Sequence, residues 1–105
     1  MLNEILLKVS KEKISEFCRK WEVKELALFG SVLTEKFRED SDIDILVAFK
    51  EDVDHSLFDL VHMQDELKQI FGREVDLVSR RGIESSRNYL RKEAILSTAE
   101  AVYAA

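Results

Sequence analysis

The chain has 105 residues, of which 46% are hydrophobic and 35% charged, with a formal net charge of −5. This composition is typical of a folded globular protein and excludes an intrinsically disordered chain. No apolar run approaches the roughly 20 residues that a membrane-spanning helix needs, so we expect one domain over residues 1–105 and no contact with a membrane.

The acidic charge argues against a broad nucleic-acid surface, because such binding depends on the neutralisation of phosphates. It suits a metal site or a basic protein partner instead. Cys18 is the only cysteine, so no internal disulfide can form, and we expect a cytoplasmic protein in which Cys18 packs as a small hydrophobe. Residues 1–13 place Glu4 within their apolar stretch and do not match a signal peptide.

The first third of the chain predicts two helices and a strand. Leu2–Val9 is short and apolar and is interpreted as helical, and Ser10 can cap a helix over Lys11–Lys20. The apolar residues of that second helix lie on one face: Ile14, Phe17, Cys18 and Trp21. Glu25–Phe29 predicts a strand that stops at Gly30.

The middle of the chain predicts a short helix, a strand and a long helix. We expect the short helix over Ser31–Phe37, capped by Ser31, and the clearest strand over Asp42–Lys50. Ser56 can cap the next helix, which extends to about Phe71. Gly72 ends it, and its expected buried stripe comprises Leu57, Leu60, Val61, Leu67, Ile70 and Phe71.

The last third predicts a strand over Glu74–Ser79 and a helix that starts near Glu84. The apolar face of this last helix is expected to comprise Leu90, Ile95, Leu96, Ala99, Val102 and Tyr103. Helices that alternate with three short strands indicate an α/β (α+β) fold, with a small mixed sheet and flanking helices.

Three aspartates stand at polar positions of otherwise apolar strands. The period of two places Asp42 and Asp44 on one face of their strand, while Ile43 and Ile45 point toward the core. Asp76 repeats the arrangement, so the three carboxylates converge if the two strands are neighbours. Carboxylate oxygens are ligands that Mg²⁺ prefers, and two Mg²⁺ ions held in this way support displacement at phosphorus.

Gly30 and Ser31 come between the first strand and the short helix. A glycine lets the backbone approach a phosphate closely, and the N-terminus of a helix offers N–H groups and a positive dipole end. The stretch therefore predicts a phosphate-binding turn followed by a metal-binding strand.

Each of these motifs has an ordinary structural explanation when taken alone. A second Asp-x-Asp, formed by Asp52 and Asp54, is expected in a solvated turn, and a Gly-Ser pair is a common turn and cap. Asp76 alone could be an exposed strand residue. The conjunction of Gly-Ser, Asp-x-Asp and a later strand aspartate favours a nucleotide site.

Other polar and aromatic residues have simpler interpretations. Trp21 is expected in the core, and His55 and His62 in contact with solvent or a partner. The arginines that could steer a triphosphate are interpreted mainly as a solvated face, and they are Arg80, Arg81, Arg87 and Arg91.

The spacing of Gly30-Ser31, ten residues, then Asp42-x-Asp44 resembles the signature of the DNA polymerase beta-type nucleotidyltransferase superfamily. The wider context resembles its minimal nucleotidyltransferases, often encoded beside HEPN-domain proteins. The resemblance covers most of the chain from about Lys11 and is carried by four stretches: LFGSVL (28–33), DSDIDILV (40–47), QDEL (64–67) and GREVDLV (72–78).

The resemblance implies a polymerase beta palm-like fold, catalytic and metal-binding roles for Asp42, Asp44 and Asp76, and contact of Gly30 and Ser31 with the triphosphate. Two Mg²⁺ ions and ATP would be the cofactor and the substrate. The chain departs from the family pattern in two positions. Thr34 stands where an arginine is common, which puts full catalytic strength in doubt, and Glu39 stands where many members have proline.

The function implied by the resemblance is the transfer of AMP from ATP to a tyrosine of a cognate HEPN toxin, so that the chain acts as an antitoxin. A chain of 105 residues leaves little room for a second domain that would hold a small molecule or an RNA. The alternative is an antitoxin or binding module that neutralises its partner by contact alone, which the Thr34 departure favours. A regulatory nucleotide-binding protein and a homo-oligomer also stay open.

Overall fold

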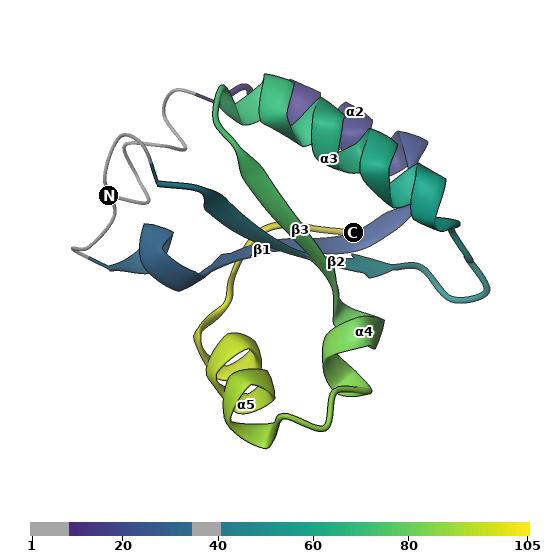
Figure 1. Cartoon of the computed structure of the whole chain (residues 1–105). Helices are drawn as coiled ribbons and strands as arrows, with labels where there is room; N and C mark the ends of the chain where they lie inside the picture. The colour runs from purple at the N-terminus through teal and green to yellow at the C-terminus, as the bar shows by residue number, and fades with distance from the viewer. Residues whose placement is uncertain (1–8, 35–40) are drawn as a thin grey trace.

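A four-stranded mixed sheet forms the centre of the molecule in the computed structural model, which describes residues 9–34 and 41–105 (Figure 1). The strand order is β3-β2-β1-β4. β1 is antiparallel to both β2 and β4, whereas β3 runs parallel to β2. The strands span Val23–Phe29 (β1), Ile43–Phe49 (β2), Val75–Ser79 (β3) and Glu100–Ala104 (β4). The α/β class with a small mixed sheet and flanking helices is confirmed.

Two helices cover one face of this sheet, and their ends follow the predicted capping residues (Figure 1). α2 spans Lys11–Lys20, and the Ser10 side chain accepts a hydrogen bond from the Lys13 amide. α3 spans Leu57–Phe71 and begins with a reciprocal capping box between Ser56 and Asp59. Gly72 ends α3 in the left-handed conformation, with φ of 67°. The expected Leu2–Val9 helix falls almost wholly on residues 1–8, outside the described residues.

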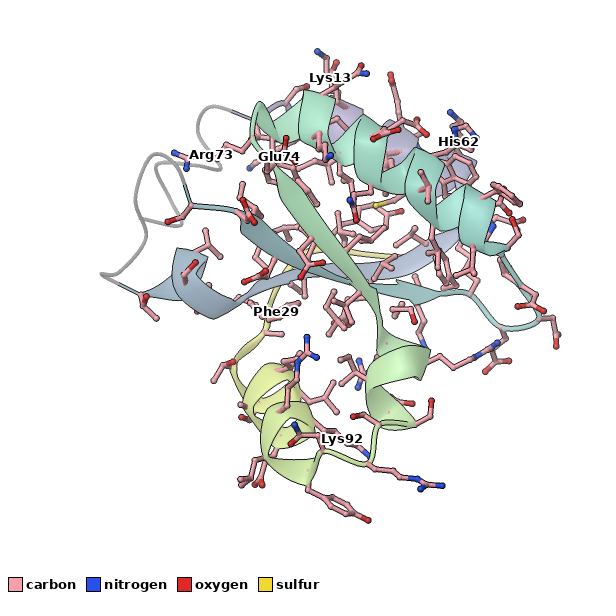
Figure 2. The ribbon with its side chains drawn as sticks, in the orientation of Figure 1. Lys13, Phe29, His62, Arg73, Glu74 and Lys92 are labelled. Atoms are coloured by element: carbon pink, nitrogen blue, oxygen red, sulfur yellow. The ribbon has the colours of Figure 1, made fainter. Side chains whose placement is uncertain are left out.

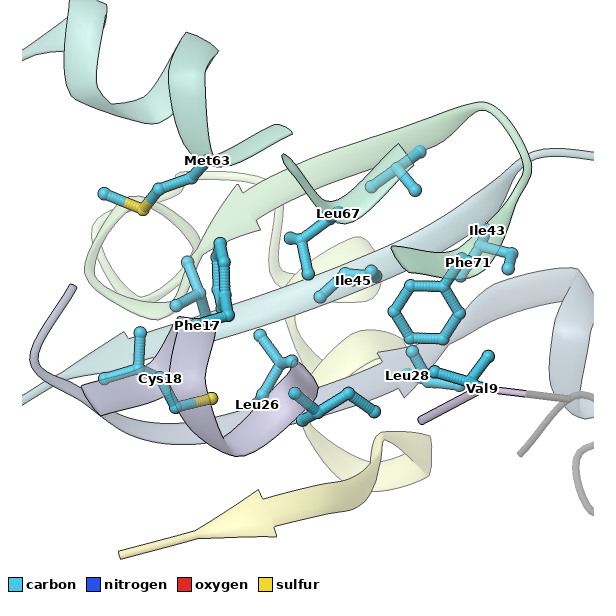
Figure 3. Close-up of a cluster of buried hydrophobic side chains, with 14 of the residues drawn as sticks. Val9, Phe17, Cys18, Leu26, Leu28, Ile43, Ile45, Met63, Leu67 and Phe71 are labelled. Atoms are coloured by element: carbon cyan, nitrogen blue, oxygen red, sulfur yellow. The ribbon is translucent and has the colours of Figure 1, made fainter. Parts of the chain in front are cut away.

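The main core lies between these helices and the sheet (Figure 3). Ile43, Ile45 and Val47 point into it from alternate positions of β2, as the period of two predicts. Cys18 is fully buried, and this burial raises the pKa of its thiol to about 12, so the side chain packs as a small hydrophobe.

The buried stripe of α3 differs from the prediction. Met63, Leu67 and Phe71 are the buried residues, whereas Leu57 is 80% exposed and Val61 is 59% exposed. At about 100° per residue, Val61 lies roughly 120° around the helix from Leu67, too far to reach the sheet. The expected stripe was therefore wrong at Leu57 and Val61.

The opposite face of the sheet carries a smaller apolar cluster beneath α4 (Arg80–Glu84) and α5 (Tyr89–Thr98) (Figure 1). Its buried members are Ala27, Phe29, Leu46, Ile83 and Ile95. The single helix expected from Glu84 onward was wrong, because the chain breaks after Glu84 and Asn88 caps a new helix.

The segment that follows α5 is a strand, not a helical continuation. Residues 100–104 form β4, which pairs with β1, and Val102 and Tyr103 pack against the main core. Pairing with a distant strand overrides the apparent helical period of this segment.

His55 and Trp21 have structural roles. The Nε2 atom of His55 lies 2.8 Å from the Trp21 carbonyl oxygen, and the imidazole ring packs against the rings of Trp21 and Phe49. The Trp21 indole packs against the core and donates a hydrogen bond of 2.9 Å to Glu66. The solvent or partner contact expected for His55 was therefore wrong, whereas His62 is exposed. Within the described ranges, every helix is too short or too polar to cross a lipid bilayer.

Substitution of Leu67 by alanine tests this account of α3. We expect Leu67→Ala to lower the free energy of unfolding by about 2–5 kcal/mol, because it removes a fully buried side chain and leaves a cavity. Leu57→Ala, the same substitution at an exposed position of the same helix, should change stability by less than about 0.5 kcal/mol. Urea unfolding followed by circular dichroism measures both values, and equal losses would contradict the structure.

Candidate functional site

The register of two parallel strands brings the candidate carboxylates together. Asp44 of β2 lies directly opposite Asp76 of β3, so both side chains leave the same face of the sheet. Asp42 comes immediately before β2 and two residues before Asp44, which places it on that face too. The face is the one that α5 covers, where Figure 2 shows the side chain of Phe29, the β1 partner of Asp44.

The Asp44 carboxylate is in an unfavourable electrostatic environment. Partial burial is the largest cause that raises its pKa above the ordinary value of 3.8, and the negative charges of Asp76 and Asp42 raise it further. The positive charge of Arg91 on α5 partly opposes this effect. Crowded anions of this kind are stabilised by a cation, which is the electrostatic condition of a Mg²⁺ site.

The side chains do not converge into a ready-made metal cage. Over residues 9–34 and 41–105, no three Asp, Glu, His or Cys side chains come close enough to hold a metal ion. The expectation that Asp42, Asp44 and Asp76 lie within metal-sharing distance is therefore not met in this arrangement, although the backbone places them on one face. The donor chemistry still fits Mg²⁺, which takes few protein carboxylates and keeps water or phosphate as its other ligands.

Gly30 follows the last residue of β1 and lies directly against Asp44. Its φ is +79°, and a Cβ atom built on it would lie 2.3 Å from Oδ2 of Asp44. Both the backbone conformation and the close approach therefore require glycine here. Thr34 and Ser31 close the following turn, in which the Thr34 hydroxyl donates a hydrogen bond of 2.9 Å to the Ser31 carbonyl oxygen.

The turn after Gly30 is shorter than expected. Gly30–Leu33 forms a single turn of 3₁₀ helix (η1), no side chain caps it, and Thr34 is extended. The prediction of a helix capped by Ser31 was therefore wrong within the described residues, and residues 35–37 of that helix lie outside them. The two-residue Gly30-Ser31 element still lies beside the acids, because Phe29 pairs with Asp44.

The candidate arginines separate into two groups. Arg80 forms ion pairs with Glu25 and Glu84, and Arg81 lies 3.9 Å from Asp54. Both line a hollow of about 490 Å³ at the carboxyl ends of β2 and β3, away from the acids. Arg91, in contrast, is close enough to Asp44 for its positive charge to lower the pKa of that carboxyl. In the sequence, only the spacing of one helical turn between Arg91 and Ile95 indicates that Arg91 lies near the sheet.

Residues 10–100 match the family model described as a nucleotidyltransferase domain. A candidate protein adenylyltransferase of Methanocaldococcus jannaschii is 40% identical over 98 residues, covering 93% of this chain and 94% of that protein. The chain belongs to the nucleotidyltransferase family. The protein adenylyltransferase MntA of Thermococcus cleftensis is 34% identical to this nucleotidyltransferase over 78% of each chain.

Solved structures support the same assignment. The structure of a candidate minimal nucleotidyltransferase matches with a TM-score of 0.69 and 31% identity, over 94% of this chain and 93% of that chain. A toxin–antitoxin complex with AMP-PNP contains the same fold, with a TM-score of 0.69 and 21% identity, over 92% of this chain and 75% of that chain. The resemblance to the minimal nucleotidyltransferases is confirmed, and this nucleotidyltransferase is an enzyme of that branch.

Replacement of Asp44 by asparagine should stabilise the metal-free protein at neutral pH. A carboxyl whose pKa is raised on folding adds stability below its ordinary pKa of 3.8, and this stability is lost as the pH rises through the folded pKa. An asparagine side chain does not ionise, so the melting temperature of Asp44→Asn should exceed that of the wild type at pH 7 in EDTA.

The difference in melting temperature should shrink as the pH falls toward 3.8. Asp54→Asn is the matched control, because Asp54 is an exposed loop aspartate and is not among the charges that act on Asp44. A lower melting temperature for Asp44→Asn at neutral pH would show that Asp44 is held for packing and not for a ligand.

Two glycines with positive φ allow the close approach at Gly30 to be measured separately. Gly72→Ala introduces the strain of a left-handed alanine, about 1–2 kcal/mol, with no atom within 4 Å of the new methyl group. Gly30→Ala carries the same strain and also forces Asp44 to move, so its loss of unfolding free energy should be clearly larger. Thermal melts of both variants provide the comparison. Equal losses of unfolding free energy would show that the close approach of Gly30 to Asp44 does not limit the residue at this position.

Proposed function

We propose that this nucleotidyltransferase transfers AMP from ATP to a tyrosine hydroxyl of a cognate HEPN toxin, with release of pyrophosphate, and so acts as an antitoxin. The main support for this proposal is the strand register, which sets Asp44 opposite Asp76 and beside the Gly30 turn. This arrangement occurs in a chain that is 40% identical, over nearly its whole length, to a candidate protein adenylyltransferase.

The relatives favour a protein acceptor. The Thermococcus cleftensis protein carries the name protein adenylyltransferase MntA. A structure with the same fold contains a tri-AMPylated HEPN toxin of Shewanella oneidensis in complex with an MNT antitoxin, with a TM-score of 0.63 and 20% identity. We extend the acceptor class and the HEPN partner to this chain on the strength of these names together with the acidic net charge, which suits a basic partner.

In this proposal Asp42, Asp44 and Asp76 hold Mg²⁺, and Gly30 and Ser31 contact the triphosphate. Bound Mg²⁺ would neutralise phosphate charge and promote ionisation of the attacking hydroxyl. Asp44 contributes a partly buried anion whose charge the neighbouring acids make costly, so a cation at this position relieves an existing repulsion. Gly30 keeps the backbone beside Asp44 clear of side-chain atoms. We place the reaction in the cytoplasm, where ATP is available and a lone thiol stays reduced.

The second candidate function is neutralisation of the toxin by contact alone. Thr34, where the family commonly has an arginine, favours it. The two candidates differ in a measurable way, because contact alone does not consume ATP.

Single substitutions of the acids separate the two candidates. Asp42→Asn and Asp44→Asn should each reduce AMP incorporation into the co-expressed toxin at least about 100-fold, because each removes a Mg²⁺ ligand. Binding to the toxin should persist in pull-down experiments. Asp54→Asn, in the second Asp-x-Asp, serves as the control that keeps full transfer. Rescue of cell growth by Asp44→Asn without AMP incorporation would refute the enzymatic antitoxin and support contact alone.

A further inference from the structure

We propose that Arg91 binds the phosphates of the nucleotide substrate from α5, on the same face of the sheet as the three carboxylates. This inference rests on the proposed function and adds a binding residue that neither the Gly-Ser nor the Asp-x-Asp motif contains.

Packing of α5 places Arg91 on this face. Ile95 is 6% exposed and belongs to the small cluster with Phe29 and Leu46. Arg91 lies one helical turn before Ile95, so its side chain leaves α5 close to the side that packs on the sheet. On the sheet, Asp44 pairs with Phe29 and lies two residues before Leu46, which puts it on the face that α5 covers.

Electrostatics agree with this placement. The positive charge of Arg91 interacts favourably with the Asp44 carboxylate, so the guanidinium group lies within electrostatic range of the acids. The Arg91 side chain is exposed, so a bound ligand can reach its guanidinium group.

The guanidinium of Arg91 is not committed to an ion pair within the part of the chain that the structure describes. The ion pairs among the described residues use Lys20, His55, Lys68, Arg80 and Arg81 as their basic members. Arg91 forms none of them, although it lies near the acids. A surface arginine that faces a ligand site without an ion pair keeps its donors for an incoming anion.

The chemistry of the ligand explains why a cation is needed at this place. A triphosphate that approaches three carboxylates meets strong repulsion, which bound Mg²⁺ offsets only in part. The planar guanidinium can donate two parallel hydrogen bonds to phosphate oxygens, and it stays charged at all relevant pH values. Arg91 would therefore supply the phosphate contact opposite the metal-binding strands.

Measurement of nucleotide affinity tests this role without reliance on transfer activity. Titration calorimetry with ATP and Mg²⁺ compares the wild type with Arg91→Gln, which keeps much of the length of the side chain and removes its charge. We expect Arg91→Gln to weaken ATP binding about 10- to 100-fold, as the loss of a charge-assisted hydrogen bond predicts. Binding of adenosine, which has no phosphate, should not change, and the melting temperature without ligand should stay close to that of the wild type.

Arg87→Gln is the matched control, because it removes the same charge from a position just before α5. ATP affinity of this variant should stay within about twofold of the wild type, because surface charges contribute little once salt screens them. Arg91→Lys, which keeps the charge but loses the two-pronged donor geometry, should bind ATP with intermediate affinity.

Each outcome decides between the two proposals. Failure of the wild type to bind ATP would overturn the proposed function. Binding by the wild type with equal affinity for Arg91→Gln, or with an equal loss in Arg87→Gln, would overturn the role of Arg91 alone. If Arg91→Gln did not fold, Arg91→Lys would carry the test, and an unchanged ratio of ATP to adenosine affinity in that variant would refute the phosphate contact.

Discussion

Parallel pairing of β2 with β3 is the constraint on which the rest of the site depends. It sets Asp44 against Asp76 on one face and Ile43 against Val75 on the other. The same backbone hydrogen bonds therefore create an electrostatic repulsion on one side and an apolar core on the other. A shift of one residue in this register would exchange the two faces and bury the carboxylates among hydrophobic side chains, at a prohibitive cost in solvation.

One face of the sheet carries most of the buried core, and the other face carries the candidate site. The large cluster under α2 and α3 contains most of the fully buried side chains and holds the strands in place. The smaller cluster, centred on Phe29, Leu46 and Ile95, holds α5 beside the acids. The structure can therefore tolerate repulsion among the carboxylates, because the burial that stabilises the fold lies on the opposite side.

Features with a local physical cause could be predicted from the sequence. Ser10, Ser56 and Gly72 delimit α2 and α3 because caps act within a few residues, and the alternation of Asp and Ile along β2 identifies its two faces. The Gly30 turn and the three aspartates are recognisable for the same reason.

Features that depend on distant partners could not be predicted. Residues 100–104 continue the apolar period of the preceding helix, so the sequence indicates a helix there, whereas their strand conformation depends on pairing with the distant β1. His55 likewise contacts Trp21, which lies far from it in the chain. Nothing in the sequence distinguishes Arg91 from the other surface arginines. Its proximity to Asp44 depends on the packing of α5 against the sheet.

β1 lies between β2 and β4, and its Leu26, Ala27 and Leu28 are almost completely buried. Its first neighbour, β2, follows closely in the chain, but β4 is the last element. The pairing of β1 with β4 is the most non-local contact of the sheet, and without β4 the strand β1 would present an open hydrogen-bonding edge flanked by apolar side chains. An open apolar edge is a template for intermolecular strand pairing, so β4 protects the sheet from aggregation through β1.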